Sequence, residues 1–199
     1  MEKQLIIFLH GVGSQGADLA GLGKFWRSAL PNAIFAAPDA PDHFSGSGGY
    51  QWFSLNGITE QNRPERIVAA RPAFDAVIQH ACDAHGVDPQ KDKLVLVGFS
   101  QGSIMALDAL ASGRWPLAGV VAFSGRLATE EMTTGHGTPV LLVHGQRDPV
   151  MPWQESEQAA RRLTAAGFAA KTAFETTSGH TITSAGVEQA QHFLSSVLA

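Results

Sequence analysis

The chain has 199 residues, of which 44% are hydrophobic and 16% charged, and its net charge at pH 7 is −4. This length is enough for a folded domain with its own core, and we expect one domain over residues 1–199. The negative net charge gives no reason to expect a basic surface that binds nucleic acid. No apolar run approaches the roughly 20 residues that span a bilayer.

Short apolar runs predict six strands that are buried on both faces. These runs are "QLIIFL" from Gln4, "AIFAAP" from Ala33, "KLVLVGF" from Lys93, "LAGVVAFS" from Leu117, "PVLLVH" from Pro139 and "KTAFET" from Lys171. Helical patterns lie between most of them, at residues 18–30, 64–85, 101–112, 154–166 and 183–198. The alternation predicts an α/β fold: a mostly parallel sheet of about six or seven strands, with helices on both faces and no separate cap domain.

Right-handed crossovers place the carboxyl ends of parallel strands at one edge of the sheet, where α/β proteins carry their chemistry. Candidate residues follow four of the predicted strand ends. They are Val12 in "HGVG", Ser100 in "GFSQG", Asp148 in "HGQRDPVMP" and His180 in "TTSGHTI". The fold therefore brings these four loops to the same edge.

The pentapeptide "GFSQG" fits the G-x-S-x-G turn between a strand and a helix, which presents a serine above the sheet edge. Gly98 and Gly102 lack a Cβ, so the backbone is able to make a tight turn. The alternative is a plain strand-to-helix turn, because short Gly/Ser turns are common. The motif alone does not separate the two interpretations.

A serine hydroxyl needs a base, and the base needs a group that orients it. On this kind of fold the chain order is Ser, then Asp or Glu, then His, and Ser100, Asp148 and His180 occur in that order. His180 is expected to act as the general base, and Asp148 to fix its tautomer and stabilise the imidazolium. His144 and Glu175 are the rival base and acid, but both lie at the end of a strand rather than in the loop beyond it.

The stretch "GVGSQG" also matches the dinucleotide fingerprint G-x-G-x-x-G, through Gly11, Gly13 and Gly16. A nicotinamide or flavin oxidoreductase is the alternative that this match supports, with Asp39 as the residue that would meet a ribose. A serine nucleophile needs N–H donors for its oxyanion, and we expect these from Val12 and Gln101. The glycines would then let the loop approach the nucleophile, and Asp39 would merely end a strand.

We expect no cofactor and no metal. His80, Cys82 and His85 resemble ligands on paper, but at about 100° per helical residue they fan out around the helix. Cys82 is the single cysteine and has no disulfide partner. The first apolar run ends in His10-Gly11 rather than in a cleavage site, so we expect no secretory signal and a cytoplasmic protein.

The motifs "FLHGVG", "QWFSLNGITEQNR", "LVGFSQGSIMAL" and "VHGQRDPVMP", with a late "GH", resemble the phospholipase/carboxylesterase family of α/β-hydrolases. This family includes the acyl-protein thioesterases, and the likeness is greatest to its small bacterial esterases. The resemblance covers nearly the whole chain, although the chain begins at what would be the third strand of the family's fold. It implies a serine esterase with the triad and the two oxyanion donors named above.

Two departures concern the substrate. Ser54 follows Trp52-Phe53 where acyl-protein thioesterases usually carry Asp, and Arg126 stands where many relatives have an apolar or aromatic residue. We expect a small-molecule ester or thioester substrate of short to medium acyl length. Acyl-protein thioesterase and lysophospholipase activities remain as alternatives, as does a catalytically silent binding module. The oligomeric state stays open.

Segment 50–58 is a candidate cover for the site. The residues that we expect to line an acyl or alkyl slot are Trp52, Phe53, Leu55, Met151 and Trp153, and Arg126 is a candidate for a substrate anion. The alternative is that the aromatic residues bury themselves beneath their loops and that the arginine ties loops together.

Overall fold

The computed structural model describes residues 2–199. Within them, six strands form one parallel sheet in the order β2-β1-β5-β6-β7-β8. The strands are β1 (Gln4–Leu9), β2 (Ala33–Ala36), β5 (Lys93–Phe99), β6 (Gly119–Phe123), β7 (Pro139–Gly145) and β8 (Ala169–Glu175). The helices are α1 (Ala20–Trp26), α2 (Arg63–Ala84), α3 (Gln101–Ala111), α4 (Gln154–Ala165) and α5 (Ser184–Val197).

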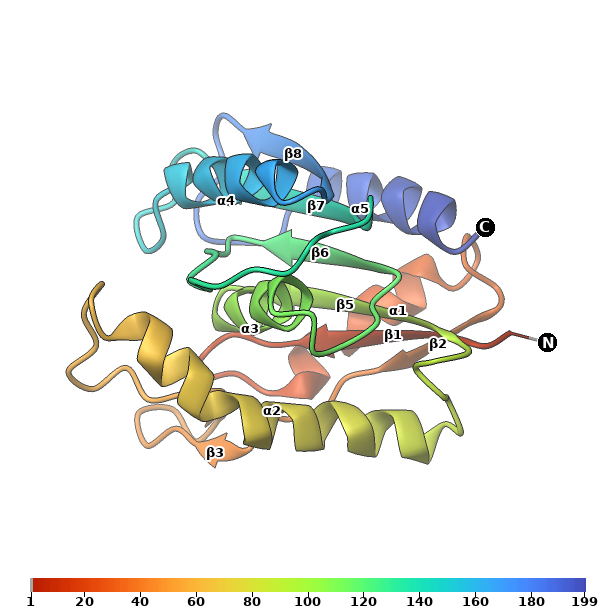
Figure 1. Ribbon diagram of the computed structural model, residues 1–199, viewed down its shortest axis with the longest axis horizontal. Coiled ribbons are helices and arrows are strands. Elements are labelled where there is room, and N and C mark those ends of the chain that lie inside the picture. The colour runs from red at the N-terminus through yellow and green to blue at the C-terminus, as the bar shows by residue number, and fades with distance from the viewer. Residues whose placement is uncertain (1) are drawn as a thin grey trace.

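Helices cover both faces of this sheet. Helices α2, α3 and α4 lie in front of it in Figure 1, and α1 and α5 lie behind it. In β1, Leu5, Ile7 and Leu9 pack in the front layer. Ile6 and Phe8 pack in the rear layer. Because successive side chains of a strand point to opposite faces, a strand covered twice is apolar at every position. The predicted α/β fold is confirmed.

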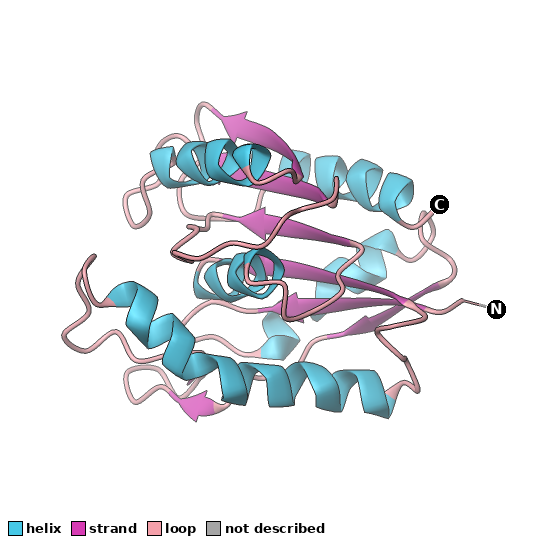
Figure 2. Cartoon of the chain, viewed as in Figure 1, coloured by secondary structure: helices cyan, strands magenta, loops and turns pink. Residues whose placement is uncertain are grey.

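The strands of the main sheet all run in one direction, with their arrowheads toward the left of Figure 2. Strands β1 and β5 are paired from Gln4 with Lys93 to Leu9 with Gly98, so they end level with each other. The loops that follow β1 and β5 therefore begin side by side.

Helix α1 is shorter than the predicted 18–30. A 3₁₀ turn at Gly16–Asp18 precedes it, and the helix ends at Trp26. Glycine is a poor helix former, by about 1 kcal/mol relative to alanine, and α1 contains Gly21 and Gly23. A Cβ on Gly23 would lie 3.0 Å from the Phe35 ring, so this glycine lets α1 approach β2 closely.

A small antiparallel ribbon, β3 (Asp42–His43) and β4 (Tyr50–Gln51), lies inside the irregular segment after β2. Strands of two residues are too short to give an alternation pattern, so the sequence did not predict them. Between β6 and β7, the described residues 124–138 form neither helix nor strand, in agreement with the expected lack of a cap domain. No helix in residues 2–199 has the length and apolarity to cross a membrane.

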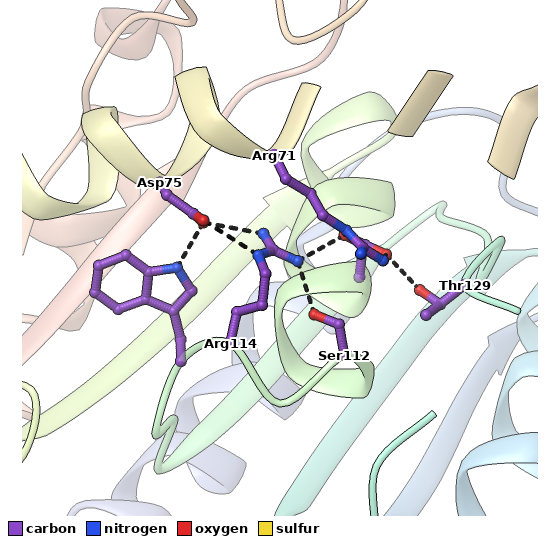
Figure 3. Close-up of polar contacts among 7 residues, drawn as sticks. Arg71, Asp75, Ser112, Arg114 and Thr129 are labelled. Carbon is purple, nitrogen blue, oxygen red and sulfur yellow. Dashed lines mark hydrogen bonds and ion pairs between the residues drawn. The ribbon is translucent and has the colours of Figure 1, made fainter. Parts of the chain in front are cut away.

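A polar network fixes α3 against α2 (Figure 3). The Asp108 side chain is 1% exposed and accepts two hydrogen bonds of 2.9 Å from the Arg71 guanidinium. Arg114 adds a third of 2.9 Å, and the Thr129 hydroxyl a fourth of 2.7 Å. Arg114 in turn reaches Asp75 on α2, at 3.0 Å. The network therefore joins α2, α3 and the two loops that follow α3 and β6.

The Asp108 carboxylate stays ionised in this setting. Burial alone would raise its pKa, but hydrogen bonds from Arg71 and Thr129 and the charges of Arg71 and Arg114 together bring the pKa below 3.8. A carboxylate whose pKa is lower in the folded state stabilises the fold above its unfolded pKa. That contribution is lost as the pH falls through the folded value.

We expect Asp108→Asn to lower the free energy of unfolding by about 3 kcal/mol at pH 7, because it leaves two arginines without their shared anion. Chemical denaturation at pH 7 and at pH 3 measures the effect. The difference between the parent and the variant should shrink at pH 3, where Asp108 of the unfolded parent is protonated. A difference that is equal at both pH values would contradict this role.

Candidate active site

Ser100 links β5 to α3 in a strained turn. Its backbone has φ 53° and ψ −116°, a conformation that residues other than glycine rarely adopt. A Cβ on Gly98 would lie 2.5 Å from the α3 backbone, and a Cβ on Gly102 would lie 2.0 Å from the Leu9 carbonyl oxygen. Both glycines are therefore required for the strand and the helix to meet. The Ser100 N–H donates to Phe123 O at 3.0 Å, which holds the turn on β6.

Ser100, Asp148 and His180 lie together although they come from three loops. His180 Nε2 is 3.0 Å from Ser100 Oγ, and His180 Nδ1 is 2.7 Å from Asp148 Oδ2. The Asp148 side chain is fully buried, whereas the His180 side chain is 17% exposed. A carboxylate, an imidazole and a hydroxyl thus form one hydrogen-bonded chain that runs from the interior toward solvent.

The Asp148 carboxylate is held from both sides. Its Oδ1 accepts hydrogen bonds of 2.8 Å from the N–H groups of Val150 and Met151, while its Oδ2 faces His180. Burial alone would raise the pKa of Asp148, but these hydrogen bonds and the charge of His180 hold it below its usual value. The carboxylate is therefore an ionised and oriented partner for the imidazole.

The loops that carry Asp148 and His180 are joined by their backbones. The Gln146 N–H donates to Glu175 O at 2.8 Å, and the Arg147 N–H donates to Ser178 O at 2.9 Å. The Glu175 carboxylate accepts hydrogen bonds from the Ser178 and Thr183 hydroxyls. Glu175, the rival acid, thus braces the loop of His180 and does not contact its imidazole within the described hydrogen bonds.

His144, the rival base, is buried inside β7. Its Nδ1 lies 2.6 Å from Ser156 Oγ, and its Nε2 lies 2.8 Å from Met151 O and 3.2 Å from Asp148 Oδ2. Because the carbonyl only accepts, Nε2 carries the proton and Nδ1 accepts from the Ser156 hydroxyl. Burial lowers the pKa of His144. This histidine is a neutral support for the turn at residues 148–151, a role that its sequence position did not reveal.

Phe99, the residue before Ser100, contacts His180. Its ring centroid lies 4.9 Å from that of His180, with the two planes tilted by 42°. This contact limits the movement of the imidazole. The letters of the sequence do not indicate this contact, although Phe99 is the second residue of the G-x-S-x-G turn.

The loop after β1 lies directly against Ser100. A Cβ on Gly11 would be 3.4 Å from Ser100 Cβ, an ordinary contact distance. The expected oxyanion donors, the backbone N–H groups of Val12 and Gln101, donate to no other group within residues 2–199. Gln101 is the first residue of α3, so its N–H lies at the positive end of the helix dipole.

The dinucleotide interpretation of the glycines does not fit their surroundings. The Gly13 N–H donates to Tyr50 O at 2.8 Å, and the Gly16 N–H donates to Asp39 Oδ1 at 2.8 Å. A Cβ on Gly16 would lie 1.9 Å from Ala37 O. The N–H groups of this loop are thus bonded within the protein, whereas a diphosphate would need them free. The Asp39 carboxylate holds the loop in place. Asp39 therefore does more than end a strand.

No cluster of three or more His, Cys, Asp or Glu side chains in residues 2–199 is arranged to hold a metal ion. Cys82 is buried in the core, whereas His80 and His85 are exposed on α2 and just beyond it. Their side chains therefore point in different directions, as the helical spacing indicates.

Trp52 and Phe53 are core residues of segment 50–58, with exposed fractions of 2% and 4%. The Trp52 ring packs edge-on against Phe74 of α2, at 5.5 Å between centroids. Both also border a hollow of about 470 Å³ between this segment and α2, and Ser100 is not among its lining residues. Leu55, in contrast, is 43% exposed.

The other expected pocket residues lie after Asp148 and β6. Met151 is 7% exposed and belongs to the front core layer. Trp153 packs edge-on against Phe174 at 5.2 Å. Arg126 Nε lies 3.2 Å from the Glu155 carboxylate, so this arginine pairs with α4.

Known proteins with similar sequences belong to one family. Residues 1–198 match the Phospholipase/Carboxylesterase family. Esterase YpfH of Escherichia coli strain K12 is 32% identical over 165 residues, which cover 83% of this chain and 70% of that protein. Acyl-protein thioesterase 1 of Saccharomyces cerevisiae is 28% identical over 167 residues, with coverages of 75% and 72%.

Solved structures agree with this result. Esterase PE8 superposes with a TM-score of 0.88 at 37% identity, over 99% of this chain and 94% of that one. A Bacillus cereus carboxylesterase, at 22% identity and a TM-score of 0.82, covers 98% of this chain and 89% of its own and shows the fold alone. The chain therefore belongs to the phospholipase/carboxylesterase family of α/β-hydrolases and is a serine hydrolase with esterase or thioesterase activity.

Proposed function

We propose that this protein is a carboxylesterase that hydrolyses esters of short to medium acyl chains through a covalent acyl-enzyme on Ser100. The observation that carries the proposal is the hydrogen-bonded chain from Asp148 through His180 to Ser100, with distances of 2.7 and 3.0 Å. A hydroxyl in contact with an oriented imidazole is the arrangement that makes serine nucleophilic.

In the proposed mechanism, Ser100 Oγ attacks the ester carbonyl carbon while His180 Nε2 takes its proton. The imidazolium then protonates the alcohol as it leaves, which forms the acyl-enzyme. In the second half of the reaction, a water molecule deprotonated by His180 attacks the acyl carbon. The bond to Ser100 Oγ then breaks as the imidazolium returns its proton to that oxygen, which releases the acid. Asp148 stabilises the imidazolium in both halves and keeps the Nδ1 proton directed at itself.

The negative charge of each tetrahedral intermediate needs donors that are already in place. The N–H groups of Val12 and Gln101 are proposed for this role, since both are unpaired and the loop of Val12 packs against Ser100. Such donors act mainly on the transition state, because the oxygen gains its charge there.

The proposal of short to medium chains rests on the small amount of exposed apolar surface near the site. Val150, two residues after Asp148, is 67% exposed, and Leu55, in the segment whose Trp52 N–H donates to Gln101, is 43% exposed. Thioester or lysophospholipid hydrolysis is the alternative, because related proteins include acyl-protein thioesterases. All three reactions use the same nucleophile and the same oxyanion.

We expect Ser100→Ala to lower kcat/KM for p-nitrophenyl butyrate by roughly 10³–10⁶-fold, because the nucleophile is lost. Ser196→Ala, at an exposed position on α5, is the matched control and should match the parent. A fluorophosphonate probe should label the parent and the control but not Ser100→Ala. Full activity in Ser100→Ala would overturn the proposed mechanism, and an unlabelled, inactive parent would favour the silent binding module.

We expect Asp148→Asn to lower kcat by roughly 10²–10⁴-fold, because an amide neither fixes the correct imidazole tautomer nor stabilises its charge. Steady-state kinetics at pH 7.5 measure the effect, with Asp83→Asn on the exposed surface of α2 as the control. Substrate KM should change little. A variant with near-parental kcat would remove Asp148 from the triad.

A substrate panel separates the proposed activity from its alternatives. We expect p-nitrophenyl esters of four to eight carbons to give a kcat/KM at least about tenfold above the sixteen-carbon ester, since a site that fits short chains has no room for the additional methylenes, and one methylene too many costs about 1–3 kcal/mol. Acyl-CoA and lysophosphatidylcholine complete the panel. A higher kcat/KM on either of these would replace the carboxylesterase assignment with the corresponding alternative.

A further inference from the structure

We propose that His10 positions the oxyanion hole. It fixes the peptide unit between Gly11 and Val12, so that the Val12 N–H is held in the direction of the oxyanion. This inference rests on the proposed function, because it takes the Val12 N–H as one of the two donors. His10 is a positioning residue: it acts through the backbone of its neighbours and is not assigned a contact with the substrate.

His10 follows β1 and is fully buried. Its Nε2 lies 2.9 Å from the Ala40 backbone nitrogen, and its Nδ1 lies 2.7 Å from Gly11 O. An amide N–H only donates, so Nε2 must be the acceptor and carries no proton. The proton of the neutral ring is then on Nδ1, which donates to the Gly11 carbonyl. The two backbone partners thus select one tautomer.

The Gly11 carbonyl and the Val12 N–H belong to the same peptide unit. In a planar trans peptide these two groups point in opposite directions, so a hydrogen bond that holds the oxygen also directs the N–H. Gly11 O accepts a second hydrogen bond, of 3.2 Å, from the Ser14 N–H, and Gly13 has φ +79° between them. This is a four-residue turn with glycine at the position that requires a positive φ.

The peptide unit is therefore held at its oxygen by two donors, one from the turn and one from His10. The Val12 N–H points away from both and is unpaired among the described residues. It lies in the loop that touches the nucleophile, since a Cβ on Gly11 would be 3.4 Å from Ser100 Cβ. Without the histidine donor, one hydrogen bond of 3.2 Å would resist rotation of this peptide.

His10 also links this loop to the second proposed donor. Its carbonyl oxygen accepts a 2.8 Å hydrogen bond from Trp52 Nε1, and the Trp52 backbone N–H donates to Gln101 Oε1 at 2.7 Å. The Gln101 side chain donates in turn to Phe53 O at 2.8 Å. Segment 50–58 thus joins the loop that carries Val12 to Gln101, and these two residues supply the proposed oxyanion donors.

Two substitutions of His10 test the roles of its two ring nitrogens separately. In His10→Gln, the side-chain oxygen is able to replace Nε2 as acceptor for Ala40, but the donor to Gly11 O is lost. In His10→Asn, the shorter amide places a donor near the position of Nδ1 and loses the contact with Ala40. We expect His10→Gln to lower kcat/KM by roughly 10–100-fold, and His10→Asn to retain at least about a fifth of the parental value.

A transition-state analogue distinguishes positioning from a general loss of structure. An alkyl trifluoromethyl ketone adds to the serine and places an oxyanion in the hole. Its Ki should rise in His10→Gln by the same factor by which kcat/KM falls. The pH profile of kcat/KM should keep its shape, because His10 does not contact Ser100, Asp148 or His180 within the described hydrogen bonds. His192→Gln, on the exposed side of α5, is the matched control.

Equal losses in His10→Gln and His10→Asn, or a loss of activity without a rise in Ki, would overturn the inference. If His10→Gln does not fold, ¹⁵N NMR of the ring in the parent protein decides the question. A protonated Nδ1 is expected, and a protonated Nε2 would exclude the hydrogen bond to Gly11 O. These outcomes differ from failure of the proposed function, which would show as an active Ser100→Ala.

Discussion

The close approach of α3 to the end of β1 is the constraint on which the site depends. Gly102 lies so near the Leu9 carbonyl that any side chain would collide with it, at 2.0 Å. Because β1 and β5 end level with each other, this contact brings the turn of Ser100 against the loop of Gly11. Ser100 and the loop that carries the proposed oxyanion donor Val12, from segments about ninety residues apart, are thereby placed within contact distance before any substrate binds.

This approach requires strain at Ser100, whose φ of 53° is costly for a residue with a side chain, on the order of 1–3 kcal/mol. The surrounding backbone offsets the strain. The Ser100 N–H is bonded to Phe123 O, and its carbonyl accepts from the Ile104 N–H in α3. At the far end of α3, Asp108 ties the helix to Arg71 of α2. Helix α3, which follows Ser100, is therefore fixed at both its beginning and its end.

The sequence was sufficient for the fold class because β1 and β5 are apolar at every buried position, a pattern that only a sheet covered on both faces explains. The sequence also predicted that Ser100, Asp148 and His180 lie at one edge of the sheet, since each follows a parallel strand. What it did not predict depends on contacts between distant segments. His10 acquires its role from Ala40 and Trp52, and nothing in the letters near His10 indicates those partners.

The same limit applies to Trp52 and Phe53. Both side chains are apolar, which suits either a pocket wall or a core. The Gln101 side chain holds the backbone of both residues through hydrogen bonds that the sequence does not show, and both side chains are buried. The short α1 and the ribbon of β3 and β4 were missed for a local reason: two glycines weaken the helix, and two-residue strands carry no periodicity.

The three histidines near the site differ in their partners, and this difference explains how a single residue type serves separate roles. His10 lies between a backbone donor and a backbone acceptor, which allow one neutral tautomer. His144 is likewise held in one tautomer by Met151 O and the Ser156 hydroxyl. His180 has the Asp148 carboxylate 2.7 Å from Nδ1 and the Ser100 hydroxyl 3.0 Å from Nε2, whereas His144 Nε2 lies nearer to Met151 O, at 2.8 Å, than to the same carboxylate, at 3.2 Å. A carboxylate stabilises the charge that an imidazole gains when it takes a proton, but burial opposes that gain, and the His144 side chain is fully buried whereas the His180 side chain is 17% exposed. These surroundings support His180 as the proposed base, and the other two histidines are suited to hold the backbone around it.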